Sequence, residues 1–333
     1  MNHDHLINHP AVLGLFAVTV VVMLLLDLGV FNRHSHVVGS KEALAWTAVW
    51  ISLSMIFSGV IYYVMGLDAF TKFQSAYWIE KALSIDNLFV FILVFGFFNV
   101  PKHLHHKVLF WGIIGALFFR AIFIFSGVAL INLTYLPTMQ VFGMQVRINV
   151  LLSVFGVFLI IAGIKSWSSH KDDDENKDFS KSPGAKVIYR FFKVTKNFEG
   201  NRFFIKQNGI RLATPLLVVV AVIEFTDLIF AVDSIPAIFA IAPNDPLILY
   251  TSNIFAILGL RAMYFLLANF MHMFSKLHYG LAVILAFIGA KMLAGPFYEI
   301  SSPHSLMVVG GILIVAVIAS FAFPEPPNPQ RGN

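Results

Sequence analysis

The chain has 333 residues, of which 58% are hydrophobic and only 12% are charged, and its mean hydropathy is +0.79. This composition excludes an ordinary soluble globular domain. The chain contains no cysteine, which excludes a disulfide scaffold, a thiolate metal site and a cysteine nucleophile. Its net charge of +5 does not indicate a nucleic-acid partner, because basic residues scattered between apolar runs more often report membrane topology.

Nine apolar runs are long enough to cross a hydrocarbon core, which takes about 20 residues. The first run ends in Leu26-Asp27-Leu28-Gly29 rather than in a small-residue cleavage site, so we expect it to persist as a membrane helix. The sequence therefore predicts an all-α polytopic membrane protein embedded in the lipid bilayer. The nine runs lie at roughly 10–31, 43–66, 77–98, 108–132, 148–168, 215–241, 248–271, 279–297 and 305–323.

The basic residues are distributed unequally between the two sides of the membrane. Of the 23 Lys and Arg residues, 17 fall in loops or tails on one side, 2 fall on the other side, and 4 lie within the predicted helices. Basic residues in short loops accumulate on the cytoplasmic side. This predicts an N-terminus outside and a C-terminus in the cytosol.

The predicted helices divide the chain into four parts. Helices one to five occupy residues 1–168, a cytosolic loop follows at 169–214, helices six to nine occupy 215–323, and a Pro-rich cytosolic tail covers 324–333. In the loop, the Asn208-Gly209 turn between two partly alternating stretches predicts a β-hairpin. This loop either seats a cytosolic partner or braces the helices, and the sequence leaves both readings open.

The chain contains an internal repeat. In helix three Glu80 precedes Asp86 by six positions, and in helix six Asp227 precedes Asp233 by the same spacing; Asn87 and Ser234 follow the second acids. Two further landmarks recur in the same order, namely Phe119-Arg120-Ala121 with Leu260-Arg261-Ala262, and Ala162-Gly163-Ile164-Lys165 with Ile288-Gly289-Ala290-Lys291. The copies begin on helices an odd number of crossings apart, so helices 3–5 and 6–8 are predicted to form an inverted repeat. Transporters with this architecture bind substrate near the midplane, between the repeats.

Acidic side chains within these helices are costly. An ionised carboxylate at the bilayer centre costs about 2.5–3.5 kcal/mol even on the lenient insertion scale, so Asp86, Glu224, Asp227 and Asp233 together cost about 10 kcal/mol. Either these acids bind a cation, or buried pairs with basic residues hold the helices in register. The candidate charge-balancing residues are Arg120, Arg261 and Lys291.

The available ligands are hard oxygen donors. All twelve His residues lie in termini, in loops or at helix ends, so no central imidazole pair is available. Carboxylates and amides suit Mn²⁺, Mg²⁺ or Ca²⁺ better than soft metals. Acids six residues apart lie about 9 Å apart along a regular helix, so we expect either stacked sites or helices broken near Asp86 and Asp233, with Pro236 favouring a break in helix six. Asn253 of helix seven is a further candidate ligand, although an embedded Asn is more often helix-packing glue.

Two acidic stretches, Glu80–Val90 and Glu224–Ala237, resemble those of the TerC family, especially its Alx-type members. The resemblance extends over nearly the whole chain and is most specific in the second stretch. It implies a bacterial inner-membrane protein of metal-ion homeostasis, a Mn²⁺ exporter in the better understood branches, with relatives tied to tellurite resistance or alkaline response.

The resulting hypothesis is divalent cation export, with Mn²⁺ as the substrate ion and no organic cofactor. Asp86 and Asp233 are the expected central ligands, and Asn87 and Ser234 add neutral oxygens. The expected entry or exit ligands are Glu80, Glu224 and Asp227, with Asp27 as a gate acid near the cytosolic end of helix one. The alternative is a non-transporting scaffold or sensor in metal, tellurite or alkaline stress, with the acids in structural ion pairs. An enzyme is not expected, because no nucleophile and base fall at matched depth.

Overall fold

The protein is a bundle of long helices with two small β-hairpins. The computed structural model describes residues 10–31, 39–141, 144–168, 178–207, 209–243, 245–270, 277–298 and 300–322. In chain order the elements are α1 (Pro10–Phe31), α2 (Ser40–Phe97), α3 (Lys102–Leu133), β1 (Met139–Val141), β2 (Met144–Val146), α4 (Val150–Ser168), the 3₁₀ turn η2 (Phe179–Lys181), α6 (Pro183–Phe191), β3 (Phe204–Gln207), β4 (Ile210–Ala213), α7 (Pro215–Phe239), α8 (Pro246–Leu258), α9 (Leu260–Phe270), α10 (Leu277–Ala294) and α11 (Ser302–Ala322).

Helix α2 turns back on itself at Gly66. The amide of Gln74 donates to the Ser58 hydroxyl at 2.8 Å, although residues 16 apart on a straight helix would lie about 24 Å from each other. The Phe57 and Phe73 rings also meet, with centroids 5.7 Å apart. Gly66 has a φ of 83°, in the left-handed region that glycine adopts without steric cost. Thus α2 is an antiparallel helical hairpin, and it contains the second and third predicted apolar runs.

The length and apolar character of the helices fit a polytopic membrane protein. Among the described residues, six helices are long and apolar enough to span a membrane, and the bent pair α8 and α9 makes a seventh candidate. Each predicted apolar run overlaps one of these helices or α1. The count of nine crossings remains a prediction.

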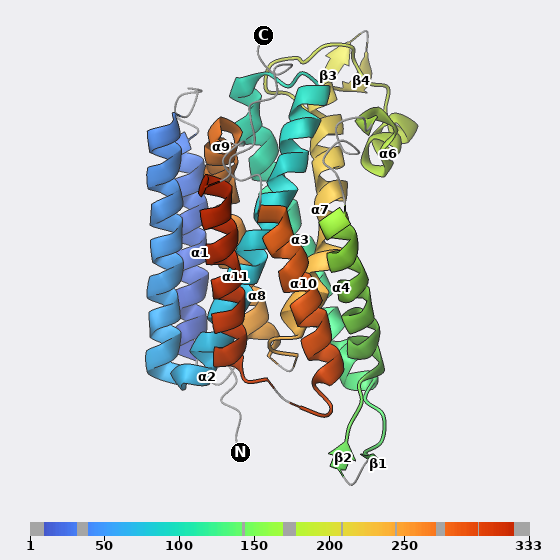
Figure 1. Cartoon of the computed structure of the whole chain (residues 1–333). Helices are drawn as coiled ribbons and strands as arrows, with labels where there is room; N and C mark the ends of the chain where they lie inside the picture. The colour runs from blue at the N-terminus through green and yellow to red at the C-terminus, as the bar shows by residue number, and fades with distance from the viewer. Residues whose placement is uncertain are drawn as a thin grey trace.

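The two ends of the bundle carry different structures. Figure 1 shows β1 and β2 at one end, and α6 with β3 and β4 at the opposite end. The sequence predicts these segments on opposite sides of the membrane, and their separation along the bundle agrees with that prediction. The β1–β2 hairpin was not predicted, because its strands are only three residues long and join two membrane runs.

The β3–β4 hairpin lies where the Asn-Gly turn predicts one. The strands pair antiparallel from Phe204 opposite Ala213 to Gln207 opposite Ile210. Gly209 has a φ of 78°, as a tight turn requires. Asn208 itself lies outside the described residues.

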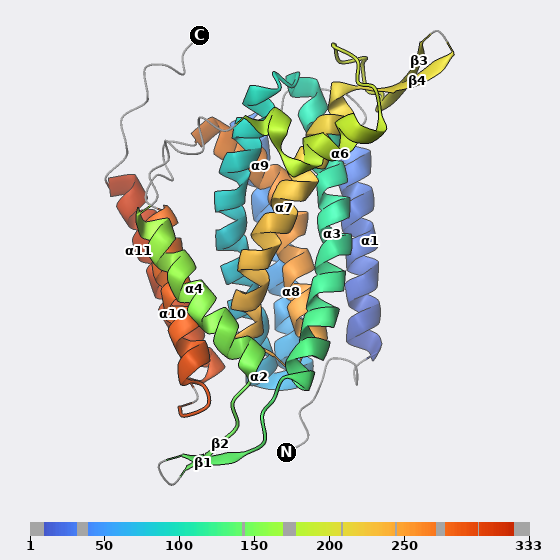
Figure 2. The ribbon, with the colours of Figure 1, turned by 90° about the vertical axis from the view of Figure 1, so that its right-hand side faces the viewer.

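Helix pairing follows a reciprocal pattern. α2 contacts α8 and α9, α3 contacts α7, and α4 lies along α10. At the α4–α10 contact glycine allows the backbones to approach closely: a Cβ added at Gly163 would lie 2.6 Å from the carbonyl oxygen of Ala282, and one at Gly289 would lie 2.5 Å from that of Gly156. Figure 2 shows α4, α10 and α11 as a tilted layer beside the other helices.

Of the two alternatives, stacked sites or helices broken near Asp86 and Asp233, the structure contradicts the second. α2 continues without interruption from Leu67 to Phe97, and α7 continues through Pro236 to Phe239. Pro236 has no backbone N–H and removes one hydrogen bond from α7, but the helix ends only three residues later, at Phe239. The chain instead breaks between α8 and α9, which meet at an angle of 40°.

Candidate functional site

A buried ion pair lies at the centre of the bundle. Glu80 of α2 and Arg120 of α3 form a salt bridge between side chains that are 0% and 1% exposed. Burying a single charge in this way would be very unfavourable, so each residue requires the other. The pair joins two helices of the first predicted repeat.

Two polar side chains complete the coordination of the pair. The Asn253 amide of α8 donates to the Glu80 carboxylate at 3.0 Å, while its carbonyl oxygen accepts from Arg120 at 3.2 Å. Ser84, one turn along α2, donates its hydroxyl to Glu80 at 3.2 Å. Glu80 therefore has three donors, and Asn253 links the pair to the second predicted repeat.

Asp227 of α7 brings a second carboxylate to the same arginine. Its Oδ1 atom lies 3.6 Å from a terminal nitrogen of Arg120, and the residue is only 6% exposed. One guanidinium thus lies between two acids from opposite halves of the chain. We call Glu80, Arg120, Asp227 and Asn253 the central network.

Lys81 lies next to this network, at the bend between α8 and α9. Its ammonium group donates to the carbonyl oxygen of Ala256 at 3.1 Å. A Cβ at Gly259 would lie 2.7 Å from this ammonium nitrogen, so glycine makes room for it at the bend. The lysine ammonium group is therefore directed at a backbone carbonyl close to the bend.

Glu224 is held against a glycine of α3. A Cβ added at Gly115 would overlap the Glu224 carboxylate. Within the described part of the protein the Oε2 atom of Glu224 is buried without a hydrogen-bond partner. Glu224 lies one turn before Asp227 on α7, as the spacing of three predicts.

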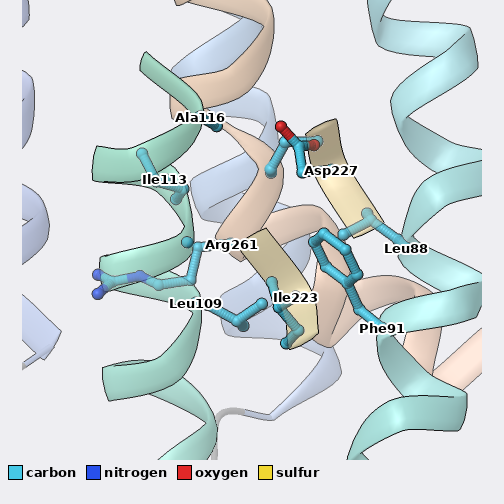
Figure 3. Close-up of a pocket in the computed structure, with 10 residues that line it drawn as sticks. Leu88, Phe91, Leu109, Ile113, Ala116, Ile223, Asp227 and Arg261 are labelled. Atoms are coloured by element: carbon cyan, nitrogen blue, oxygen red, sulfur yellow. The ribbon is translucent and has the colours of Figure 1, made fainter. Parts of the chain in front are cut away.

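A small cavity opens beside the network. It is lined by Asp227 and Arg261 together with apolar side chains of α2, α3 and α7, and its volume of about 10 Å³ is close to that of one water position. Figure 3 shows the Arg261 guanidinium pointing away from the Asp227 carboxylate. Among the contacts described, Arg120 meets Glu80 and Asp227, and Arg261 lines the cavity wall.

Asn87 and Ser234 lie on the same helix faces as the network acids. Each follows its acid, Glu80 or Asp227, by seven residues, which is two helical turns or about 10 Å along the axis. Both are buried, and the Ser234 hydroxyl has no hydrogen-bond partner among the described residues. A second polar level therefore lies about two turns from the central network in both halves.

Three predicted site residues fall outside this description. The side chains of Asp27, Asp86 and Asp233 are not among those that the structure describes, although their backbones are helical. Within the side chains that are described, no three His, Asp or Glu residues gather as a metal site. Lys291 lies in the last turn of α10, and its charge-balancing role stays a prediction.

The sequence alone did not identify three contributors to this region. Ser84 was overlooked although it follows Glu80 by one turn, a spacing that places two side chains in contact. Gly115 and Ala256 carry no polar side chain, so no residue pattern marks their contacts with Glu224 and Lys81. Asn253 was considered as a ligand, and the structure places it between the two charges of the ion pair.

The arrangement holds fixed negative charge with a basic side chain as counter-ion. The two carboxylates that meet Arg120 carry two negative charges against one guanidinium, and the Lys81 ammonium group, on the residue after Glu80, donates to a backbone carbonyl. Such a site can exchange its bound cationic side chain for a cation from solution if the acids are released. It can equally hold four helices together without any ligand.

Comparison with known proteins places the chain among bacterial membrane proteins. It is 43% identical over 316 residues to the uncharacterized membrane protein STKORF319 of Myxococcus xanthus, covering 94% of this chain and 93% of that protein. It is 40% identical over 335 residues to the protein of Escherichia coli strain K12 named "Putative membrane-bound redox modulator Alx", covering 98% and 99% of the two chains. No solved structure matches it significantly. Residues 65–326 match the profile of the integral membrane protein TerC family, and the chain therefore belongs to this family.

Proposed function

We propose that the protein exports a divalent metal cation, Mn²⁺ first, across the bacterial inner membrane. The observation that carries the proposal is the meeting of Glu80 and Asp227, one from each predicted repeat, on the single buried guanidinium of Arg120. Carboxylates held together at this depth are costly unless they serve a cation. Their oxygens match the preference of Mn²⁺ for hard ligands.

The packing of the helices supports an inverted repeat around this site. Gly289 follows Gly163 by 126 residues, and Ala282 follows Gly156 by the same 126 residues. The contact of Gly163 with Ala282 and that of Gly289 with Gly156 are therefore equivalent under exchange of the two repeats. A two-fold axis makes such contacts in pairs. The packing of α2 on α8 and α9 and of α3 on α7 follows the same exchange.

In this proposal the acids at positions 86 and 233 are the central ligands. Asn87 and Ser234 contribute neutral oxygens, and the network carboxylates accept the ion on its way in or out. Arg120 occupies the acids while no metal is bound, which keeps them from repelling each other. Displacing or releasing this arginine is then part of each transport cycle.

The contacts that Glu80 makes within the central network also favour a second function. Glu80 already has Arg120, Asn253 and Ser84 as partners without a metal. A non-transporting scaffold or sensor would require only this. The Escherichia coli relative is named as a putative redox modulator. Because this chain has no cysteine, a thiol-disulfide reaction of its own is excluded.

Ion flux into proteoliposomes containing only this protein separates the two functions. We expect Mn²⁺ to move, with Ca²⁺ and Mg²⁺ as weaker competitors, and we expect Asp86→Asn and Asp233→Asn to abolish movement while membrane abundance stays near normal. Asp68→Asn is the matched control, because Asp68 is an exposed helical acid paired only with Lys72. If no divalent cation moves at any pH, or if the double variant still transports, the exporter proposal fails and the scaffold takes its place.

A further inference from the structure

The segment from Asp178 to Thr214 carries a strong local excess of positive charge. It contains eight Lys and Arg residues but only two acids, Asp178 and Glu199. Asp178 is already engaged: the Ser180 hydroxyl and the Lys181 ammonium group hold the pKa of its carboxyl below the usual range, and Lys181 lies 2.9 Å away. One acid is thus neutralised locally, and most of the basic side chains remain uncompensated.

These basic side chains point into solvent. Lys186, Lys193, Lys196 and Lys206 are exposed, and no ion pair is seen for them within the described residues. Arg211 is also exposed on the hairpin, with its guanidinium 4.2 Å from the centroid of the Phe204 ring. A surface built in this way attracts anions.

Large apolar side chains are exposed among the same charges. On α6, Gly184, Ala185 and Ile188 are buried, with Gly184 against the backbone of α7 at Ala221, while Phe191 is 71% exposed. On the hairpin, Ile210 is 56% exposed. Basic residues beside exposed aromatic and aliphatic residues are typical of elements that lie in a membrane interface.

The segment is fixed to the helices rather than freely hanging. The Phe203 ring lies 4.4 Å from the Lys107 ammonium group and 5.9 Å from the Trp111 ring, both on α3. Lys107 also donates to the carbonyl oxygen of Asn201. Trp prefers the level where lipid headgroups meet hydrocarbon, so Trp111 indicates that the hairpin sits near that level. Figure 2 shows β3 and β4 reaching sideways past the bundle at the end that carries α6.

We propose that α6 and the β3–β4 hairpin form a platform, residues 178–214, that binds the anionic headgroups of the lipids beside the bundle. The lysines and arginines pair with headgroup phosphates, and Phe191 and Ile210 insert at the edge of the hydrocarbon. An acidic protein or an RNA would also meet the charges, but neither accounts for apolar side chains exposed at the level of the interface. The platform acts whatever ion the central network serves.

The absence of native cysteine allows a direct test. An Ile210→Cys variant carries one label, an environment-sensitive fluorophore, and is placed in nanodiscs whose phosphatidylglycerol content rises from none to half in a phosphatidylcholine background. We expect the emission to shift to the blue as phosphatidylglycerol increases, and the shift to disappear at high salt. Gln140→Cys on β1 is the matched control, because that hairpin carries no Lys or Arg in its strands and should not respond.

Neutralising the platform tests the charges themselves. Each basic residue near an anionic surface contributes about fivefold, so Lys186→Gln, Lys193→Gln and Lys206→Gln together should weaken the preference for phosphatidylglycerol at least about tenfold. If this triple variant does not fold, the salt titration of the labelled single variant tests whether charge holds the platform to the lipid. A label at Ile210 that reads the same in both lipids would overturn the proposal. So would a label that responds only to added polyglutamate or RNA, which would instead indicate a soluble partner.

Discussion

Replacing Arg120 with methionine should cost the protein a large part of its stability. The substitution keeps a long apolar stem but removes the positive charge that, among the described residues, contacts both Glu80 and Asp227. Glu80 keeps its hydrogen bonds from Ser84 and Asn253, whereas Asp227 loses the one cationic partner described for it. Two carboxylates that are at most 6% exposed are then left facing each other.

The size of the loss follows from the geometry. At 3.6 Å and an effective dielectric constant of about 20, the attraction between Arg120 and Asp227 is about 5 kcal/mol. Removing one partner of a buried pair costs about 3–5 kcal/mol in measured cases, because the stranded acid takes up a proton and limits the loss. We therefore expect Arg120→Met to lower the free energy of unfolding by about 3–5 kcal/mol.

Unfolding in mixed micelles, followed through the fluorescence of the five tryptophans, measures this loss. Adding Glu80→Gln to Arg120→Met should recover about 1–3 kcal/mol, because it removes a stranded charge. Arg147→Met is the matched control: Arg147 stacks 4.5 Å from the centroid of the Tyr135 ring near the β1–β2 end, and its loss should cost less than about 1 kcal/mol. An Arg120→Met protein as stable as the unmodified one would refute the buried ion pair.

Three further outcomes are expected. Gly115→Ala should displace the Glu224 carboxylate, destabilise the protein by about 1–3 kcal/mol and reduce ion flux. In the control Gly59→Ala the added methyl group meets no neighbouring atom within 4 Å, so stability and flux should not change. Equal flux in both variants would contradict the contact between Gly115 and Glu224. Reporters fused after Ala242 should read outside and those near Pro183 inside, and a cytosolic signal at Ala242 would reverse the orientation. Divalent cation binding, measured by competition across a pH series, should strengthen as pH rises because protons and metal compete for the same carboxylate oxygens, and binding that is independent of pH would argue against carboxylate ligands.

Features that depend only on residues close together in the sequence could be predicted from the sequence. The apolar runs overlap helices because about 20 consecutive apolar residues satisfy their backbone only as a helix in lipid. The β3–β4 hairpin follows from an Asn-Gly turn that fixes local dihedral angles. The acidic stretches also identified the family, and the family profile agrees.

Tertiary structure decided which charges meet. Glu80, Arg120, Asp227 and Asn253 come from four helices, and no local pattern states that these four side chains meet. The sequence predicts that the chain reverses between the runs 43–66 and 77–98, and the structure places the reversal at Gly66 within one continuous α2. Pro236 favoured a break in the helix, but α7 continues through it and ends three residues later.

The difference between what the sequence predicted and what only the tertiary structure decided has a physical cause. Insertion into lipid and local turn geometry are properties of short segments, so the sequence by itself determined the class of protein, the approximate helices and the candidate acids. The pairing of buried charges depends on which helix faces pack together, and that depends on contacts between residues 40 to 173 positions apart. α3 packs on α7 and α2 packs on α8, and this packing brings Arg120 between the carboxylates of Glu80 and Asp227.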